Sequence, residues 1–146
     1  MQAILFIGVQ ASGKSTFYRE RFFTTHVRIS LDLLRTRHRE RQFFETCLTT
    51  RQPLVIDNTN PTLAERRPYL EAARAAGYRT IGYYFQSSIE ECKRRNSQRP
   101  SEQIVPLAGL LGTYAKLELP SYDEGFDELF YVKGTEMRFD VEEWRR

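Results

Sequence analysis

The sequence predicts a three-layer α/β fold, in which a central, mostly parallel sheet of about five strands carries helices on both faces. Short apolar runs alternate along the chain with longer amphipathic segments, as expected for strands that are connected by helices. A glycine-rich loop lies between the first apolar run and a segment that favours helix. The 146 residues suffice for one domain, residues 1–146, and no repeat or linker divides them.

The predicted elements follow each other regularly. Strands are expected at residues 3–7, 26–29, 54–57, 80–85 and 129–132. Helices are expected at residues 14–23, 31–51, 61–76, 88–98 and 106–117. Residues 118–126 are expected to form a structured loop, and residues 133–146 a polar tail without a clear element.

Capping residues support three of these helix boundaries. Asn60 beside Pro61 predicts an N-cap followed by a proline at the first helical position. Gly77 suits the end of the preceding helix. Ser88 with Glu91 has the spacing of a capping box.

The glycine-rich loop carries the strongest functional signal. Residues 8–15 are Gly-Val-Gln-Ala-Ser-Gly-Lys-Ser and fit G-x-x-x-x-G-K-[ST], the phosphate-binding loop of P-loop NTPases. A strand that runs through such a loop into a helix directs backbone N–H groups at one place, where an anion can bind. The chain is therefore expected to bind a nucleoside triphosphate, with Lys14 on the β- and γ-phosphates and Ser15 on Mg²⁺. The other nucleotide-binding positions of the loop are Gly8, Ala11, Ser12, Gly13 and Thr16. A chance glycine-rich turn is the alternative, which the strand–loop–helix context disfavours.

The composition gives weaker indications. Cys47 and Cys92 have no metal-ligand spacing and offer no disulfide framework, so a reducing, cytoplasmic compartment is expected. No stretch approaches the ~20 apolar residues that cross a bilayer, so no membrane partner is expected. The net charge is +3, and all but four of the 22 basic residues are arginine, which favours ligands rich in phosphate.

Asp32 is the first candidate for chemistry on an acceptor. It follows the second predicted strand, and ligands of open parallel sheets lie beyond the carboxyl ends of the strands. A carboxylate there could take the proton of an attacking hydroxyl. On one helix, Arg35 and Arg39 would share its face and could bind a neighbouring phosphate. The alternative is an aspartate that complements the helix dipole and pairs with Arg35, and spacing alone favours it.

Asp57 is the second candidate. It ends the third predicted strand, where an acidic residue could assist Mg²⁺ directly or through water. Asn58, Thr59 and Asn60 follow it and form a polar cluster on the acceptor side. The alternative for this segment is an Asx-type turn in which Asn60 caps the next helix.

A basic run forms the third candidate. Residues 93–106 include Arg95 and Arg99 at a helix end and in the loop after it, and they could fold over the phosphates as a lid. A solvated basic helix end is the alternative, and composition does not decide between them.

Taken together, these motifs resemble the polynucleotide 5′-kinase family, which includes the kinase domains of phage polynucleotide kinase and of the mammalian kinase–phosphatase. The P-loop is shared with many kinases and is not specific. The segments that carry the resemblance are 32–35, which is similar to the family's D-x-x-R, 55–61, 95–99 followed by Val105-Pro106, and Pro120 with 124–126. The resemblance spans about residues 2–132.

The resemblance implies an activity and roles for particular residues. It implies that ATP with Mg²⁺ is the donor and that the 5′-hydroxyl end of DNA or RNA is the acceptor. Asp32 becomes the general base, which overturns the dipole alternative; Arg35 becomes a contact to the acceptor's phosphate. Lys14 and Arg99 become ligands of the nucleotide phosphates at the reacting centre. No D-x-D-x-[TV] phosphatase motif is present, so any end-healing would be 5′-phosphorylation only.

Two other functions stay open. A small-molecule kinase on the same scaffold would act on a sugar, antibiotic or nucleotide-sugar hydroxyl. A non-catalytic nucleotide-binding module or a switch ATPase would serve a partner protein, and the sequence does not identify that partner. The joint presence of Lys14, Ser15, Asp32 and Arg99 favours an enzyme over that module.

Overall fold

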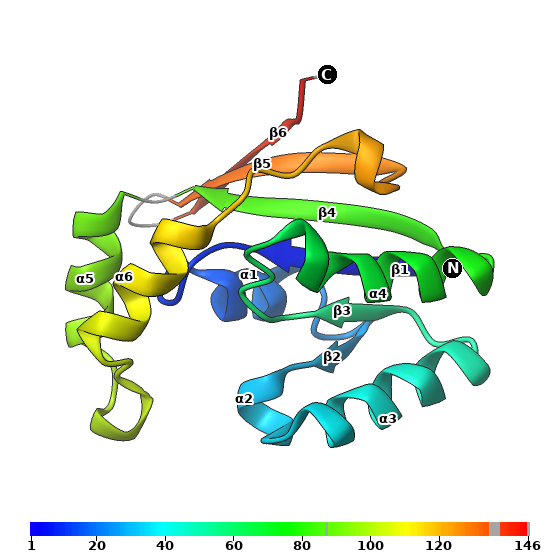
Figure 1. The fold of residues 1–146 in the computed structure, drawn as a ribbon, viewed down its shortest axis with the longest axis horizontal. Coiled ribbons are helices and arrows are strands. Elements are labelled where there is room, and N and C mark those ends of the chain that lie inside the picture. The colour runs from blue at the N-terminus through cyan, green and yellow to red at the C-terminus, as the bar shows by residue number, and fades with distance from the viewer. Residues whose placement is uncertain (87, 135–137, 146) are drawn as a thin grey trace.

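The structure is a computed structural model that describes residues 1–86, 88–134 and 138–145. Within these residues, six strands form one sheet in the order β2-β3-β1-β4-β5-β6 (Figure 1). The strands are β1 (Gln2–Ile7), β2 (Val27–Ile29), β3 (Leu54–Ile56), β4 (Arg79–Gln86), β5 (Glu128–Gly134) and β6 (Phe139–Glu143). The first five are parallel to their neighbours, and β6 pairs antiparallel with β5. The predicted fold class and five strands are confirmed, with strand ends shifted by one or two residues.

The helices connect these strands and cover the sheet on both faces (Figure 1). They are α1 (Lys14–Arg21), α2 (Leu31–Leu34), α3 (Arg37–Thr49), α4 (Leu63–Ala75), α5 (Ile89–Ser97) and α6 (Leu107–Lys116), with short 3-10 turns at Ser101–Gln103 and Tyr122–Glu124. The second 3-10 turn lies within residues 118–126 and gives the predicted structured loop its order.

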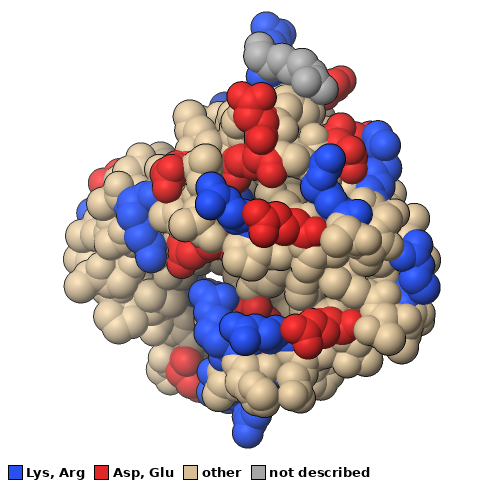
Figure 2. Space-filling model, turned by 45° about the vertical axis from the view of Figure 1, so that its right-hand side comes forward, with Lys and Arg blue, Asp and Glu red and all other residues tan. Residues whose placement is uncertain are grey.

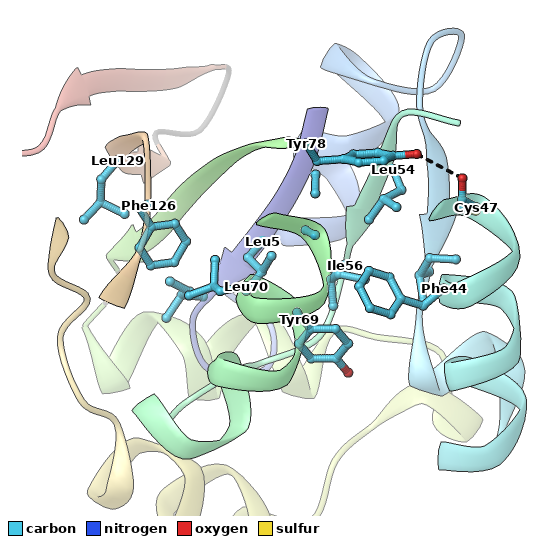
Figure 3. Packing of buried hydrophobic residues seen from close by; sticks show 14 of the residues in the cluster. Leu5, Phe44, Cys47, Leu54, Ile56, Tyr69, Leu70, Tyr78, Phe126 and Leu129 are labelled. Atoms are coloured by element: carbon cyan, nitrogen blue, oxygen red, sulfur yellow. Dashed lines mark hydrogen bonds between the residues drawn. The ribbon is translucent and has the colours of Figure 1, made fainter. Parts of the chain in front are cut away.

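The core lies on both sides of β1, because successive residues of a strand point to opposite faces. Leu5 belongs to the cluster formed with α3 and α4, which also contains Ile56 and Phe44 (Figure 3). Phe6 belongs to the opposite cluster, which contains Phe17 from α1. Because both faces of β1 are buried from Ala3 onward, the sequence from Ala3 to Ile7 is continuously apolar rather than alternating.

The predicted single helix over residues 31–51 is wrong, because the helix is interrupted at Arg35. Arg35 has φ 78°, and its backbone N–H closes α2 on the carbonyl of Leu31. Thr36 then caps α3, accepting a hydrogen bond from the Arg39 backbone N–H at 3.1 Å. Asp32 and Arg39 therefore lie on different helices, and the predicted stripe on one helical face does not form.

The predicted N-cap at Asn60 is also wrong. Asn60 adopts φ 44°, and its side-chain amide donates to the Phe6 carbonyl at 2.8 Å, which ties this loop to β1. Thr62 caps α4 instead, accepting from the Glu65 backbone N–H at 3.2 Å. Of the capping box predicted for Ser88 and Glu91, the bond from the Glu91 backbone N–H to Ser88 Oγ, at 3.1 Å, is confirmed.

No element was expected in residues 133–146, yet β6 forms there. Phe139 packs edge-on against Phe17 with ring centroids 5.2 Å apart, and Trp144 packs against Tyr84. The alternation of Phe139 and Val141 with acidic residues was a strand signal that the polar composition concealed. Residues 135–137 and 146 of the predicted tail lie outside the described residues. Among the helices described, none is long and apolar enough to cross a membrane.

Candidate active site

The P-loop leaves the carboxyl end of β1 and enters α1. Gly13 adopts φ 99° directly before Lys14 begins the helix, and Ala11 adopts φ 62°. A side chain at Gly8 would meet Phe85 and Ser12 at 3.0 Å, so the loop requires glycine there. The Gly8 N–H donates to the Thr59 carbonyl at 3.0 Å, which fixes the loop after β3 against the P-loop.

Lys14 lies folded into its own loop. Its Nζ donates to the carbonyls of Gly8 at 3.0 Å and Val9 at 2.7 Å, and to Ser12 Oγ at 3.4 Å. Burial lowers the pKa of Lys14 to about 8, although the negative charge of Asp57 opposes this shift. A buried ammonium that is held only by neutral oxygens fits a site that gains stability when an anion arrives.

The hydroxyl of Ser15 and the carboxylate of Asp57 lie side by side. Ser15 Oγ donates to Asp57 Oδ2 at 3.1 Å. The guanidinium of Arg28, on β2, contacts both: Nε donates to Asp57 Oδ2 at 2.8 Å and Nη2 to Ser15 Oγ at 3.2 Å. Oxygen ligands of this kind suit Mg²⁺, so this pair fits the predicted metal role.

Asp32 lies in the first turn of α2, and hydrogen bonds from neighbouring elements hold that turn. Ser30 caps α2 through the Leu33 backbone N–H. The Leu31 backbone N–H donates to Asn58 Oδ1 at 2.8 Å, and Asn58 Nδ2 donates to the buried Glu40 at 2.7 Å. The Asn58 amide therefore supports α2.

A cleft of about 220 Å³ brings most of the predicted site residues together. We call it the P-loop cleft; it is lined by Gln10, Ala11, Gly13, Lys14, Ser15, Thr16, Asp32, Asp57, Asn58, Thr59, Arg95 and Arg99. Gly8 and Ser12 are buried within the loop itself. Arg35 and Arg39 are exposed and do not line the cleft. Larger hollows lie between α3 and α4 and along β6, and neither includes P-loop residues.

Arg99 has a buried nitrogen that suits an anionic ligand. In the described part of the chain, its Nη1 has no hydrogen-bond partner, and its charge contributes to the low pKa of Lys14. An unpaired buried donor is costly, so a phosphate that accepts from it would recover that cost. Asn96 orders the segment that carries Arg99, because its side chain bonds the backbone N–H and carbonyl of Val105 at 3.0 and 2.7 Å.

Sequence reasoning missed three polar residues of this region: Arg28, Glu40 and Asn96. Arg28 had a usable signal, since it is a basic residue within a short predicted strand and follows the half-buried pattern of an edge strand. Glu40 and Asn96 gave no such signal in the sequence. Their hydrogen-bond partners lie in other segments of the chain, and the packing of those segments brings the partners together.

These features are those of P-loop proteins of the kinase-like class. The sequence of residues 4–120 matches the AAA domain family, and the chain belongs to that family.

Two curated relatives support the resemblance to polynucleotide kinases. The chain is 26% identical over 129 residues to the bifunctional polynucleotide phosphatase/kinase of Schizosaccharomyces pombe, covering 86% of this chain and 32% of that protein. It is 29% identical over 156 residues to a putative bifunctional polynucleotide phosphatase/kinase of Acanthamoeba polyphaga mimivirus, covering 99% of this chain and 37% of that protein. The chain thus spans about a third of the length of these relatives.

Solved structures confirm the fold. Kti12 of Chaetomium thermophilum, crystallised with ADP-AlF3, has a TM-score of 0.68 at 14% identity and covers 90% of this chain and 88% of its own. A gluconokinase from Sinorhizobium meliloti 1021 has a TM-score of 0.61 at 20% identity, covering 90% of this chain and 82% of its own. At these identities the likeness concerns the fold alone.

Proposed function

We propose that the chain is an ATP-dependent kinase that transfers the γ-phosphoryl group to the 5′-hydroxyl end of DNA or RNA. One observation carries the proposal: the carboxylate-bearing residue Asp32 lines the same cleft as Lys14 and Arg99. The similarity to polynucleotide phosphatase/kinases supports the choice of acceptor. The proposed setting is nucleic-acid end-healing in the cytoplasm.

The donor would be held by the P-loop. Lys14 and the backbone N–H groups at the start of α1 would bind the phosphates, and Arg99 would bind them from the lid. Ser15 and Asp57 would hold Mg²⁺, which supplies neutralisation of charge on the β- and γ-phosphates. Arg95 lines the same cleft and would add positive charge on that side.

Asp32 would act on the acceptor. Its carboxylate orients the 5′-hydroxyl and takes the hydroxyl proton while the new O5′–Pγ bond forms. The bond from Pγ to the β–γ bridging oxygen breaks, and its electron pair leaves with ADP. Arg35, three residues further at the end of α2, would contact the phosphate of the terminal nucleotide.

One observation favours a second candidate, a kinase for a small neutral hydroxyl compound. Neither Arg35 nor Arg39 lines the P-loop cleft, so the cleft itself contains no arginine from the acceptor side. Basic and acidic side chains are interspersed on the face shown in Figure 2, without a broad area of one sign. With neither arginine lining the cleft, a polynucleotide would have to reach Arg35 or Arg39 outside it for a phosphate contact.

The test is transfer of label from γ-labelled ATP. The acceptors are 5′-hydroxyl DNA and RNA oligonucleotides, compared with sugars and other small hydroxyl compounds. Label on oligonucleotides supports the proposal, label on a small compound alone supports the second candidate, and release of free phosphate alone indicates a switch ATPase. Asp32→Asn should retain ATP binding and lose ~10²–10⁴-fold in turnover. Full turnover in that variant would remove Asp32 from the chemistry.

A further inference from the structure

Arg28 bonds to both residues that would hold the metal. Its Nε contacts Asp57 Oδ2 at 2.8 Å and its Nη2 contacts Ser15 Oγ at 3.2 Å, while Ser15 itself bonds to Asp57 at 3.1 Å. The three groups form a closed triangle. A cation is thus already present where the two candidate metal ligands meet.

The ion pair between Arg28 and Asp57 is important for stability because the carboxylate is buried. The side chain of Asp57 is 2% exposed and that of Arg28 is 28% exposed. A buried carboxylate without a partner is strongly unfavourable, so Asp57 needs a cationic side chain beside it while no metal is bound. The register of β2 with β3 pairs Arg28 with Val55, two residues before Asp57, so the backbone keeps this cation close.

The shape of the side chain also matters. The planar fork of arginine can donate to two oxygens at once, whereas a lysine ammonium is a single point charge. The Arg28 guanidinium also lies over the ring of Tyr18, 6.0 Å from its centroid, which helps to define its orientation. Among the described residues, Arg28 is the cation that forms an ion pair with Asp57.

We propose that Arg28 is an internal cation that occupies the Ser15–Asp57 pair until a nucleotide binds, so that divalent metal binds there only together with nucleotide. This inference rests on the metal role assigned to that pair under the proposed function. Arg28 must release Ser15 Oγ before a metal can use it. The phosphates of a bound nucleotide give the guanidinium another anion to contact, which lowers the cost of that release. By thermodynamic linkage, metal and nucleotide then strengthen each other's binding.

A purely structural ion pair is the competing explanation, and the two differ in what a metal does once Arg28 is removed. If Arg28 occupies a metal site, Arg28→Gln leaves a buried carboxylate that a divalent cation can neutralise. If Arg28 is only structural, the variant is destabilised and no cation restores it.

The experiment measures Mn²⁺ binding by electron paramagnetic resonance, with neither nucleotide nor acceptor present. Arg28→Gln should bind Mn²⁺ at least about tenfold more tightly than the unmodified protein, a coupling of ordinary size between interacting sites. Mn²⁺ should also raise its melting temperature more than it raises that of the unmodified protein. Arg67→Gln, which removes an exposed charge on α4, is the control and should change neither quantity.

Two further variants secure the interpretation. Adding Asp57→Asn to Arg28→Gln should abolish both the tighter binding and the rise in melting temperature. Arg28→Lys keeps the charge, so it covers the case in which Arg28→Gln does not fold; its Mn²⁺ affinity should be higher than that of the unmodified protein. Equal Mn²⁺ affinity in the unmodified protein and the folded Arg28 variants would overturn the proposal.

A separate measurement keeps this proposal apart from the proposed function. In the unmodified protein, a non-hydrolysable ATP analogue should increase Mn²⁺ affinity beyond what the free analogue binds, and Arg28→Gln should show less of this increase. None of these readouts depends on an acceptor. Phosphoryl transfer to an oligonucleotide can therefore be absent although the Mn²⁺ results support the role of Arg28. Equally, transfer can be observed although the Mn²⁺ results contradict that role.

Discussion

Asn58 accepts a hydrogen bond from the backbone N–H of Leu31 at 2.8 Å, which joins the loop after β3 to the first residue of α2. The same amide donates to the buried carboxylate of Glu40, which also accepts from the hydroxyl of Tyr69. The position of Asp32, one residue after Leu31, therefore depends on a polar network beneath it. Asn58 is predicted to bind the acceptor, and from its two hydrogen bonds we propose that it also positions Asp32.

Asn58→Ala should weaken that network and reduce turnover. The change leaves Glu40 and the Leu31 N–H without these partners, which should cost roughly 1–3 kcal/mol in the free energy of unfolding. The KM for ATP should change little, because the P-loop itself is intact, while kcat falls. Denaturant unfolding and steady-state kinetics would measure both effects. An unchanged kcat with reduced stability would show that Asn58 is merely structural.

The low pKa of Lys14 predicts a pH dependence of nucleotide binding. Burial lowers this pKa to about 8, so the free protein loses the Lys14 proton as the pH rises through that value. Phosphates favour the ammonium form, so ATP affinity should fall above pH 8, and binding near that pH should take up protons. Calorimetry in buffers of different ionisation enthalpy detects this uptake. If ATP binding took up no protons between about pH 7.5 and about pH 9, a window of roughly one pKa unit around 8, the prediction would be contradicted.

The same shift has a consequence for stability. The unfolded chain holds its Lys14 proton up to an ordinary pKa of 10.5, whereas the folded chain releases it from about 8. Between these values the unfolded state binds more protons, so this residue makes the folded state relatively more stable as the pH rises. Below pH 8 the buried charge is a cost in the free protein, and bound phosphate would relieve it. Lys14→Met should remove this contribution to the pH dependence of unfolding.

The fold was predictable from the sequence where one local pattern decided the outcome. The apolar runs around Leu5, Val55 and Ile81 became neighbouring strands because a parallel sheet buries both of its faces. The break at Arg35 was not predictable from amphipathic spacing, because a residue with positive φ ends α2 and Thr36 starts a new helix.

In the candidate site, too, features set by a local sequence pattern were predictable, and features set by contacts between distant segments were not. Lys14 and Asp57 could be assigned from a motif and from the end of a strand. The contact of Arg28 with that pair depends on the register between β2 and β3, and the support from Glu40 depends on packing between α3 and α4. Sequence patterns do not encode such long-range distances directly.

Arg35 and Arg39 provide a test of how the acceptor binds. Arg35 ends α2 beside Asp32, whereas Arg39 lies on α3, so the broken helix separates them. Arg35→Ala should raise the KM for an oligonucleotide far more than the KM for ATP, and it should reduce the salt slope of oligonucleotide binding by about one. Arg39→Ala removes the same charge and should have a smaller effect on both. Equal effects of the two variants would indicate general attraction rather than a defined phosphate contact.

Arg99 should show opposite effects on stability and on nucleotide binding. Its Nη1 is buried without a hydrogen-bond partner among the described residues, and its charge lies close enough to Lys14 to lower the pKa of that lysine. Arg99→Gln removes both costs from the free protein, so its melting temperature should rise. Removing a positive charge from the lid side of the cleft should weaken ATP binding by about tenfold or more. Arg94→Gln makes the same change at an exposed position of α5 and should leave both quantities near those of the unmodified protein. A lower melting temperature together with unchanged ATP affinity in Arg99→Gln would mean that the arginine stabilises the lid and does not bind phosphate.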